Sequence, residues 1–336
     1  MTAEKVIEVK SLSAAYGKKN KLTQVVKDVS FSVNKGEILG IVGESGCGKS
    51  VTSLSMMGLN QQMTVTGQVL FGKQNLLSLK EKQWRKIRGN EFSMIFQEPM
   101  TSLNPLFTIG DQLTESVIIH KKISKKAAKQ KSVEMMEIVG LPRPAQLLKQ
   151  YPHELSGGMR QRIMIAMALI CDPKMLIADE PTTALDVTIQ AQILKLLKQM
   201  NEQLGTAIML ITHDLGVVLN VCQRVAIMYA GRIVEEGDVK TIFKHPKHPY
   251  TQGLFQSIPT LESKNKKLYS IEGNVPKPGS IKKGCTFAPR CPLSFDRCFQ
   301  AEPPLYKADT GQLARCFLVE EGGEQLEKRI AEGTTS

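Results

Sequence analysis

The chain has 336 residues, of which 42% are hydrophobic and 23% charged, and its formal net charge is +12. This length can bury one large α/β domain and a smaller one. Its longest uninterrupted apolar stretch, 163–171, is far too short for a transmembrane helix, and residues 1–10 lack the apolar centre of a signal peptide. We therefore expect a cytoplasmic chain that reaches a membrane only through other chains.

The first motif is a glycine-rich loop between a predicted strand and a predicted helix. Residues 43–50 have the phosphate-binding form G-x-x-x-x-G-K-[ST]. Residues 37–42, which are free of charge after Glu37, predict a short buried strand before the loop. Residues 50–58 predict a helix after it, whose N-terminus stabilises anions. Lys49 supplies a positive charge, and Ser50 offers a hydroxyl to Mg²⁺. The residues expected to contact nucleotide here are Gly43, Glu44, Ser45, Gly46, Cys47, Gly48, Lys49, Ser50 and Val51.

Part of the positive charge is concentrated in one polar segment with helix-like spacing. The lysines are Lys121, Lys122, Lys125, Lys126, Lys129 and Lys131. No aromatic residue is interleaved with them, which favours one solvated helix face, with anionic lipid headgroups as its candidate neighbour, over a nucleic-acid site. Nucleic acid is the less favoured alternative.

Two further segments combine with the loop. Ser156, Gly157 and Gly158 offer a hydroxyl and glycine amides at the start of a predicted helix from Met159 onward, which is a second anion site. Residues 175–178 predict a buried parallel strand that ends in Asp179 and Glu180. Asp179 would face the Mg²⁺ of a nucleotide, and Glu180 would polarise the attacking water. The alternative is a surface acidic pair that caps a helix.

The order of these motifs resembles the nucleotide-binding subunits of ABC transporters, and Leu-Ser-Gly-Gly-Met-Arg-Gln-Arg at 155–162 is similar to their signature. The resemblance implies an α/β fold with an ABC-type P-loop nucleotide-binding domain: a RecA-like core, an antiparallel β subdomain and a helical subdomain. It also implies that two such subunits meet head to tail. Ser156, Gly157 and Gly158 would then act on ATP held by the partner.

The same resemblance assigns four more residues. Tyr16 resembles the aromatic that stacks on adenine, although such a tyrosine often only packs. Gln97 resembles the glutamine that touches Mg²⁺ and senses the transmembrane partner. Asp186, in Ala184-Leu185-Asp186, resembles the loop that crosses to the opposite site, and His213 resembles the histidine at the γ-phosphate.

These resemblances divide the chain into a nucleotide-binding domain at 1–240, with a helical subdomain at about 98–160, and an extension at 241–336. The extension resembles the C-terminal region of ATPases that drive oligopeptide, dipeptide and nickel importers. His245 and His248, each followed by proline, are metal ligands or, as we favour, part of a rigid turn.

The extension also contains Cys285, Cys291, Cys298 and Cys316, which are four of the seven cysteines. The clustering of four cysteines in so short and polar a region suggests that they form a covalent cross-link or bind a structural metal. Disulfides are disfavoured in the cytosol, and the spacing lacks the tight C-x2-4-C pairs usual for zinc, which stays an alternative together with buried thiols. The resemblance to dipeptide-importer ATPases implies a [4Fe–4S] cluster, which we favour.

The sequence is therefore interpreted as the ATP-hydrolysing subunit of an ABC importer for di- or oligopeptides, with ATP and Mg²⁺. The implied partners are a second, related ATPase chain, two transmembrane permease subunits and an extracytoplasmic solute-binding protein, and the location is the cytoplasmic face of the membrane. The alternatives are an importer for nickel or another small solute, and a soluble ABC ATPase that acts on nucleic acid or ribosomes. A phosphate-loop kinase would leave the signature unexplained.

Overall fold

The structure, a computed structural model, describes residues 4–17, 22–97, 102–182, 186–257, 270–308 and 310–320. Chain contacts group these residues into two compact parts. We call residues 4–8, 32–38 and 70–211 the helical part, and residues 9–31, 39–69 and 212–320 the phosphate-loop part.

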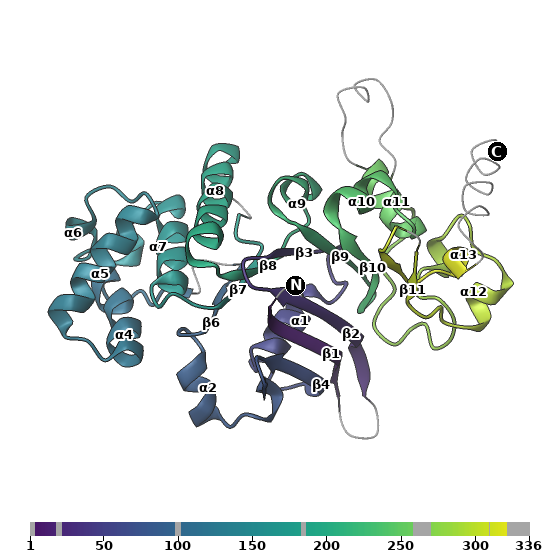
Figure 1. The fold of residues 1–336 in the computed structure, drawn as a ribbon, viewed down its shortest axis with the longest axis horizontal. Coiled ribbons are helices and arrows are strands. Elements are labelled where there is room, and N and C mark those ends of the chain that lie inside the picture. Colours follow the sequence, from purple (N-terminus) through teal and green to yellow (C-terminus); the bar gives the residue numbers. More distant parts are fainter. Residues whose placement is uncertain are drawn as a thin grey trace. The chain divides into compact units, whose positions relative to one another are not determined.

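A mixed sheet forms the centre of the phosphate-loop part (Figure 1). Its strands, in spatial order, are β11 (Tyr306–Lys307), β12 (Leu313–Ala314), β10 (Arg232–Asp238), β9 (Arg224–Tyr229) and β3 (Ile38–Val42). β3 and β9 are parallel, whereas β9, β10, β12 and β11 are antiparallel neighbours. All five residues of β3 are buried, as expected of an apolar strand covered on both faces. The strand predicted at 37–42 is thereby confirmed.

A second sheet places β1 (Lys5–Tyr16) between β2 (Thr23–Asn34) and β4 (Thr64–Phe71). The end of β4 pairs antiparallel with β5 (Gln74–Asn75). The helices of the phosphate-loop part are α1 (Lys49–Met56), α9 (Leu215–Val221), α10 (Val239–Lys244), α11 (Pro249–Gln256), α12 (Asp296–Gln300), α13 (Phe317–Glu320) and the 3₁₀ turn η4 (Ala288–Arg290).

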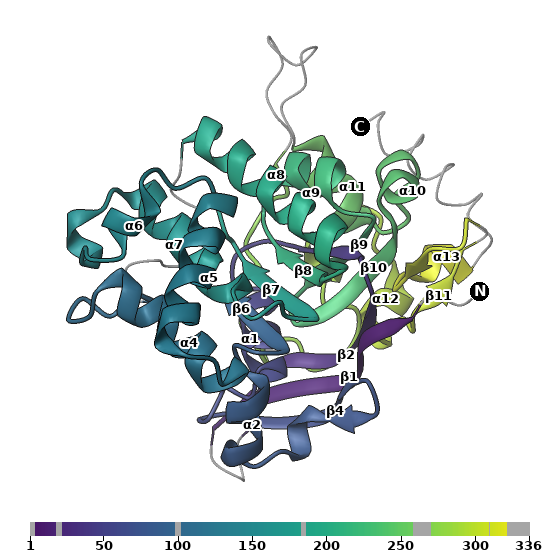
Figure 2. The same cartoon turned by 60° about the vertical axis from the view of Figure 1, so that its left-hand side comes forward.

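The helical part contains three parallel strands in the order β8 (Ala207–Ile211), β7 (Met175–Asp179) and β6 (Phe92–Ile95). Every residue of these strands is buried, and β7 confirms the strand predicted at 175–178. Its helical elements are η1 (Leu76–Ser78), α2 (Glu81–Ile87), α4 (Ile109–Lys121), α5 (Lys125–Ile138), α6 (Pro144–Leu147), η2 (Pro152–Glu154), α7 (Gly157–Leu169) and α8 (Val187–Leu204). Helices α4, α5, α6 and α7 lie together (Figure 2).

The lysine-rich segment differs from its prediction as one helix face. α4 ends at Lys121, Lys122 adopts a left-handed conformation with φ 53°, and Ser124 caps the new helix α5. The lysines therefore lie on two helices and the turn between them. Lys131 pairs with Asp172 at 2.7 Å, whereas Lys125 and Lys126 are exposed.

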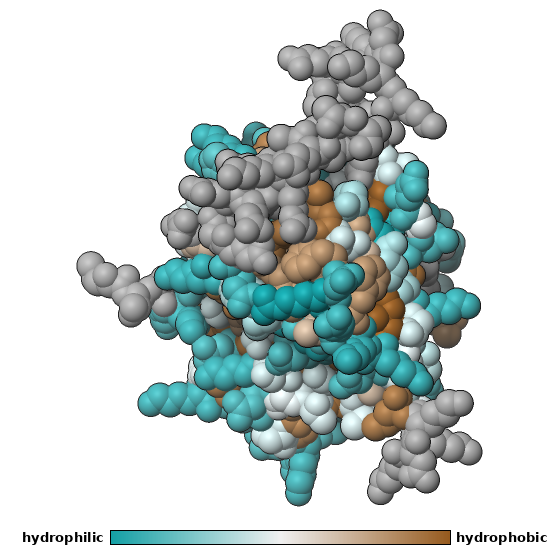
Figure 3. Space-filling view, turned by 90° about the vertical axis from the view of Figure 1, so that its right-hand side faces the viewer, coloured by the Kyte–Doolittle hydropathy of each residue, from teal (hydrophilic) through white to brown (hydrophobic). Residues whose placement is uncertain are grey.

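The extension packs on the strands of the phosphate-loop part through aromatic side chains. Phe287 lies 5.1 Å from Tyr229 of β9 and 5.4 Å from Tyr250 of α11, measured between ring centroids. All three are buried. On the face that carries the extension, hydrophilic side chains surround smaller hydrophobic areas (Figure 3). Because β12 also pairs with β10, the extension is built into the core of this part.

Candidate functional site

The phosphate-binding loop connects β3 to α1 and is fixed against the β9–β10 connection. Gly231 donates its N–H to the Cys47 carbonyl at 2.8 Å. A Cβ at Gly43 would lie 2.2 Å from the Met228 carbonyl oxygen, and Gly48 has φ 108°, so both positions require glycine. The loop is thus preformed by backbone contacts.

Lys49, the first residue of α1, lies over this loop. Its ammonium donates to the carbonyls of Gly43 at 2.7 Å and Glu44 at 3.1 Å. Ser45, Gly46 and Ser50 are exposed, Val51 is half-buried, and Cys47 is buried. Burial raises the pKa of the Cys47 thiol, so this cysteine is a packed structural side chain rather than a nucleophile.

The carboxylates predicted after the buried strand lie at the end of β7 in the helical part. Asp179 is 4% exposed. Glu180 has φ 45°, a left-handed conformation that is rare outside glycine, and its N–H donates to the Ile211 carbonyl at 2.9 Å. Gln97, which follows β6, donates from Nε2 to Glu180 Oε2 at 3.0 Å. The parallel strands β6 and β7 therefore bring Gln97 and Glu180 together across 83 positions of sequence.

The signature-like segment begins α7 rather than preceding a helix at Met159. Ser156 is the N-cap, and its hydroxyl accepts a hydrogen bond from the Met159 N–H at 3.4 Å. A Cβ at Gly157 would meet no atom of the described residues within 4 Å, and one at Gly158 would make ordinary contact with Ile189. Packing among the described residues therefore does not require glycine at 157.

The remaining predicted residues lie at the ends of strands and helices. Asp186 caps α8, accepting from the Ile189 N–H at 2.9 Å, whereas Ala184 and Leu185 lie outside the described residues. His213 is exposed and lies two positions after the last residue of β8. Tyr16, 49% exposed at the end of β1, lines an open pocket with Gly17 and residues 59–63.

The four cysteines of the extension line one cavity, whose walls include Phe287 and Phe317. All are free thiols, and burial raises the pKa of Cys291 and of Cys316 to about 12. Across the described ranges, no group of three or more His, Cys, Asp or Glu side chains is arranged to hold a metal ion. His248, one of the two histidines in question, is buried and caps α11, where its Nδ1 accepts from the Tyr250 N–H at 3.0 Å. That geometry agrees with the rigid turn.

Sequence reasoning missed the residues of the extension that contact the phosphate-binding loop. Arg290 forms a two-pronged ion pair with Glu44, with nitrogen–oxygen distances of 3.0 and 3.2 Å. Tyr250 accepts the Glu44 N–H through its hydroxyl at 2.9 Å. No local sequence pattern predicts these contacts, because 246 positions separate Arg290 from Glu44 and 206 separate Tyr250 from Glu44. Asp214, the N-cap of α9, was also missed, although an aspartate before Leu-Gly-Val-Val is a cap signal.

No helix in the part of the chain that the structure describes is long and apolar enough to cross a membrane.

Comparisons with known proteins show the family of this chain. Residues 26–183 match the family described as ABC transporter, and residues 234–298 match the oligopeptide/dipeptide transporter C-terminal region. The chain is similar to the oligopeptide transport ATP-binding protein AppD of Bacillus subtilis (strain 168), with 51% identity over 323 residues that cover 95% of this chain and 98% of that protein. The dipeptide transport ATP-binding protein DppD of the same organism is 50% identical over 324 residues, covering 96% and 97%.

A solved ATP-binding cassette, in a dimeric post-hydrolysis state bound to ADP and Pi, matches with a TM-score of 0.63 and 27% identity. That match covers 69% of this chain and 98% of the solved one. The chain therefore belongs to the ABC transporter family, among the ATP-binding proteins that carry the oligopeptide/dipeptide transporter C-terminal region.

Proposed function

We propose that this chain is the ATP-hydrolysing subunit of a multi-subunit ABC importer for di- or oligopeptides, and that it couples ATP binding and hydrolysis to movements of a permease. The relatives named for oligopeptide and dipeptide transport, which match over 95% and 96% of this chain, support the assignment. The C-terminal match, described as the oligopeptide/dipeptide transporter C-terminal region, also supports peptides. An importer for nickel or another small solute is the second candidate.

In this proposal residues 43–51 bind the ATP phosphates, and Tyr16 stacks on adenine. Ser156, Gly157 and Gly158 bind the nucleotide of a partner ATPase, and Asp186 crosses to the opposite site. The open space at Gly157 supports this role, because a second molecule can approach the backbone there.

Glu180 is the proposed base, and its hydrogen bond to Gln97 is the observation that carries the assignment. A non-glycine residue in a left-handed conformation at a strand end is typical of functional sites. Ser50, Gln97 and Asp179 would hold Mg²⁺, which neutralises phosphate charge, and His213 would contact the γ-phosphate. Hydroxyl, amide and carboxylate oxygens are the ligands that Mg²⁺ prefers.

The proposed partners are a second, related ATPase chain, two transmembrane permeases and an extracytoplasmic solute-binding protein, at the cytoplasmic face of the membrane. We divide the chain into a nucleotide-binding domain at 1–240 and an extension at 241–336, as expected from sequence.

The test is Glu180→Gln in the assembled transporter. Glutamine keeps the acceptor for Gln97 but cannot take a proton, so ATP binding is expected to persist while turnover falls by roughly two orders of magnitude or more. Lys49→Ala is the contrasting control, because it removes the charge at the phosphates and is expected to weaken binding itself. Hydrolysis by Glu180→Gln at the parent rate would reject Glu180 as the base.

We further propose that Cys285, Cys291, Cys298 and Cys316 hold a structural [4Fe–4S] cluster, with zinc as the alternative. The convergence of four thiols on one cavity supports this donor set. Because the four thiols are not already arranged to coordinate a metal, we expect binding of the cluster to bring them closer together.

Anaerobic purification tests the cluster. For the parent protein we expect about four irons per chain and broad absorbance at about 400 nm. Both signals are expected to be lost in Cys291→Ser. Cys222→Ser is the matched control, because this buried thiol is not among those lining the cavity. An iron-free parent protein would reject the cluster, and one zinc per chain would favour the alternative.

A further inference from the structure

Arg290 is a nearly fully buried cation whose donors are all engaged. Its side chain is 6% exposed. Nη1 and Nη2 donate to the two carboxylate oxygens of Glu44 at 3.0 and 3.2 Å. Nε donates to the Glu272 carbonyl at 2.8 Å, and Nη2 reaches the carbonyls of Ile271 and Gly273 at 3.2 Å each. Only the planar fork of arginine satisfies so many acceptors at once.

The extension also holds the backbone of the same loop residue. Tyr250, 0% exposed, accepts the Glu44 N–H at 2.9 Å, and its ring packs against Tyr229 at 4.6 Å between centroids. Arg290 donates to the Tyr229 hydroxyl at 3.4 Å. Glu44 is therefore fixed through its side chain and its backbone by residues that belong to no nucleotide motif.

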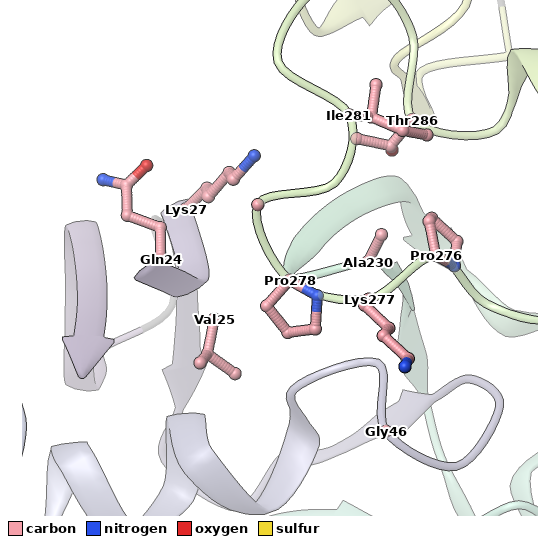
Figure 4. A pocket seen from close by; sticks show the side chains of 11 residues that line it. Gln24, Val25, Lys27, Gly46, Ala230, Pro276, Lys277, Pro278, Ile281 and Thr286 are labelled. Carbon is pink, nitrogen blue, oxygen red and sulfur yellow. The ribbon is translucent and has the colours of Figure 1, made fainter. Parts of the chain in front are cut away.

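The position of Glu44 bears directly on the cation of the phosphate-binding loop. Its carbonyl accepts from the Lys49 ammonium at 3.1 Å, beside the Gly43 carbonyl at 2.7 Å. A small movement of Glu44 would change where that charge lies. The carbonyl anchors of Arg290 also precede the segment Pro276–Pro278, which lines a pocket together with Gly46 of the loop (Figure 4).

Charge adds to the positional argument. The Glu44 carboxylate is a negative charge on a loop that is to receive a polyanion, and its side chain is 30% exposed. Arg290 neutralises it at hydrogen-bond distance. Without this partner the carboxylate would repel the nucleotide phosphates.

We propose that Arg290 is a positioning residue for nucleotide binding: it anchors and neutralises Glu44, so that the C-terminal extension sets the affinity of the phosphate-binding loop for MgATP. This inference rests on the proposed function of the loop. The chemical class of the ligand is a magnesium nucleoside triphosphate.

The test is a double-mutant cycle on the full-length protein, with MgATP affinity measured by calorimetry. Arg290→Gln is expected to weaken binding about tenfold, and more steeply at low salt, because the unpaired carboxylate faces the phosphates. In a Glu44→Gln background the same change is expected to cost about threefold or less, because the repelling charge is gone. General loss of packing would give equal losses in both backgrounds, and that result would overturn the proposal.

Control variants keep the outcomes apart. Arg297→Gln removes another arginine of the extension, paired with Glu320 at 2.7 Å, and is expected to leave MgATP affinity unchanged. If Arg290→Gln does not fold, Arg290→Lys enters the same cycle, since it keeps the charge but not the fork. Failure of the parent to bind MgATP, or unaltered binding by Lys49→Ala, would instead refute the proposed function.

Discussion

Ser156 shows how one side chain can carry a structural and a proposed functional task. Its hydroxyl caps α7, as caps of this type do in many helices. Among the described residues, packing gives the neighbouring Gly157 no reason to lack a Cβ. The cap accounts for Ser156, whereas the missing side chain at Gly157 is what the proposed approach of a second molecule would require.

Ser156→Arg separates the two tasks. We expect the isolated subunit to keep its ATP affinity, while ATP-driven dimerisation is lost because the long side chain intrudes on the partner's nucleotide. Light scattering with a Glu180→Gln background measures the dimer. Ser124→Arg removes an equivalent cap, on α5, and is expected to dimerise normally. Normal dimerisation of Ser156→Arg would contradict the head-to-tail arrangement.

At the scale of elements, helix α8 owes its position to a buried face and to both of its ends. Ile193, Leu197 and Met200 are buried at helical spacing. Gly205 ends the helix in a left-handed conformation with φ 66°, and Asp186 caps its start. Asp186 is therefore a helix cap in addition to its proposed role at the opposite nucleotide site.

Asp186→Asn and Asp186→Ala distinguish these contributions. Alanine loses the cap and is expected to reduce the free energy of unfolding by about 1 kcal/mol, whereas asparagine keeps the acceptor and the stability. If Asp186 acts at the opposite site, Asp186→Asn still lowers ATP turnover in the assembled transporter. Parent turnover in the asparagine variant would leave Asp186 as a cap alone. Denaturant unfolding and steady-state hydrolysis provide the two measurements.

Strand β10 carries a buried carboxyl that makes stability depend on pH. Burial raises the pKa of Glu235 from 4.5 to about 7, although hydrogen bonds from the N–H groups of Lys247 and His248 oppose the shift. The folded state therefore holds this proton over a pH range in which the unfolded state has released it. The stabilisation from this group is complete below pH 4.5 and is lost as the pH rises toward about 7.

Glu235→Gln tests that dependence. The difference in unfolding free energy, parent minus variant, is expected to fall as the pH rises from 4.5 to about 7, by up to about 3 kcal/mol. Burial lowers the pKa of His248 to about 3, which gives the opposite slope but is common to both proteins. A difference that stays level across this range would show that Glu235 does not titrate there.

For the molecule as a whole, prediction succeeded where the signal was local. The runs before Gly43 and Asp179 are continuously apolar, so they gave the positions of β3 and β7 directly. β11 and β12 have two residues each, too few for any periodicity, and were missed. The lysines at 121–131 were assigned to one helix face because charge spacing does not reveal that Lys122 turns the chain.

The motifs of the candidate site could be predicted from the sequence, whereas the contacts that hold the phosphate-binding loop in place could not. Lys49, Glu180 and Ser156 could be proposed as site residues because each lies in a short stretch with a characteristic order of residues. The ion pair between Arg290 and Glu44 depends on tertiary packing, and neither periodicity nor motif spacing carries information about such contacts.

The antiparallel pairing of β12 with β10 bears on how this protein can be shortened. β12 occupies the hydrogen-bonding side of β10, with Ala314 opposite Glu235. A chain that ends at residue 240 would bare that side as an open edge, and unpaired edges recruit strands from other molecules. We expect this truncated protein to aggregate during refolding even though it contains every nucleotide motif, while a chain ending at residue 320, which keeps β11 and β12, stays monodisperse by size-exclusion chromatography. A soluble, monomeric 1–240 fragment would contradict this expectation. Aggregation of that fragment would show that the C-terminal extension, by pairing with the edge of β10, prevents this protein from associating with itself.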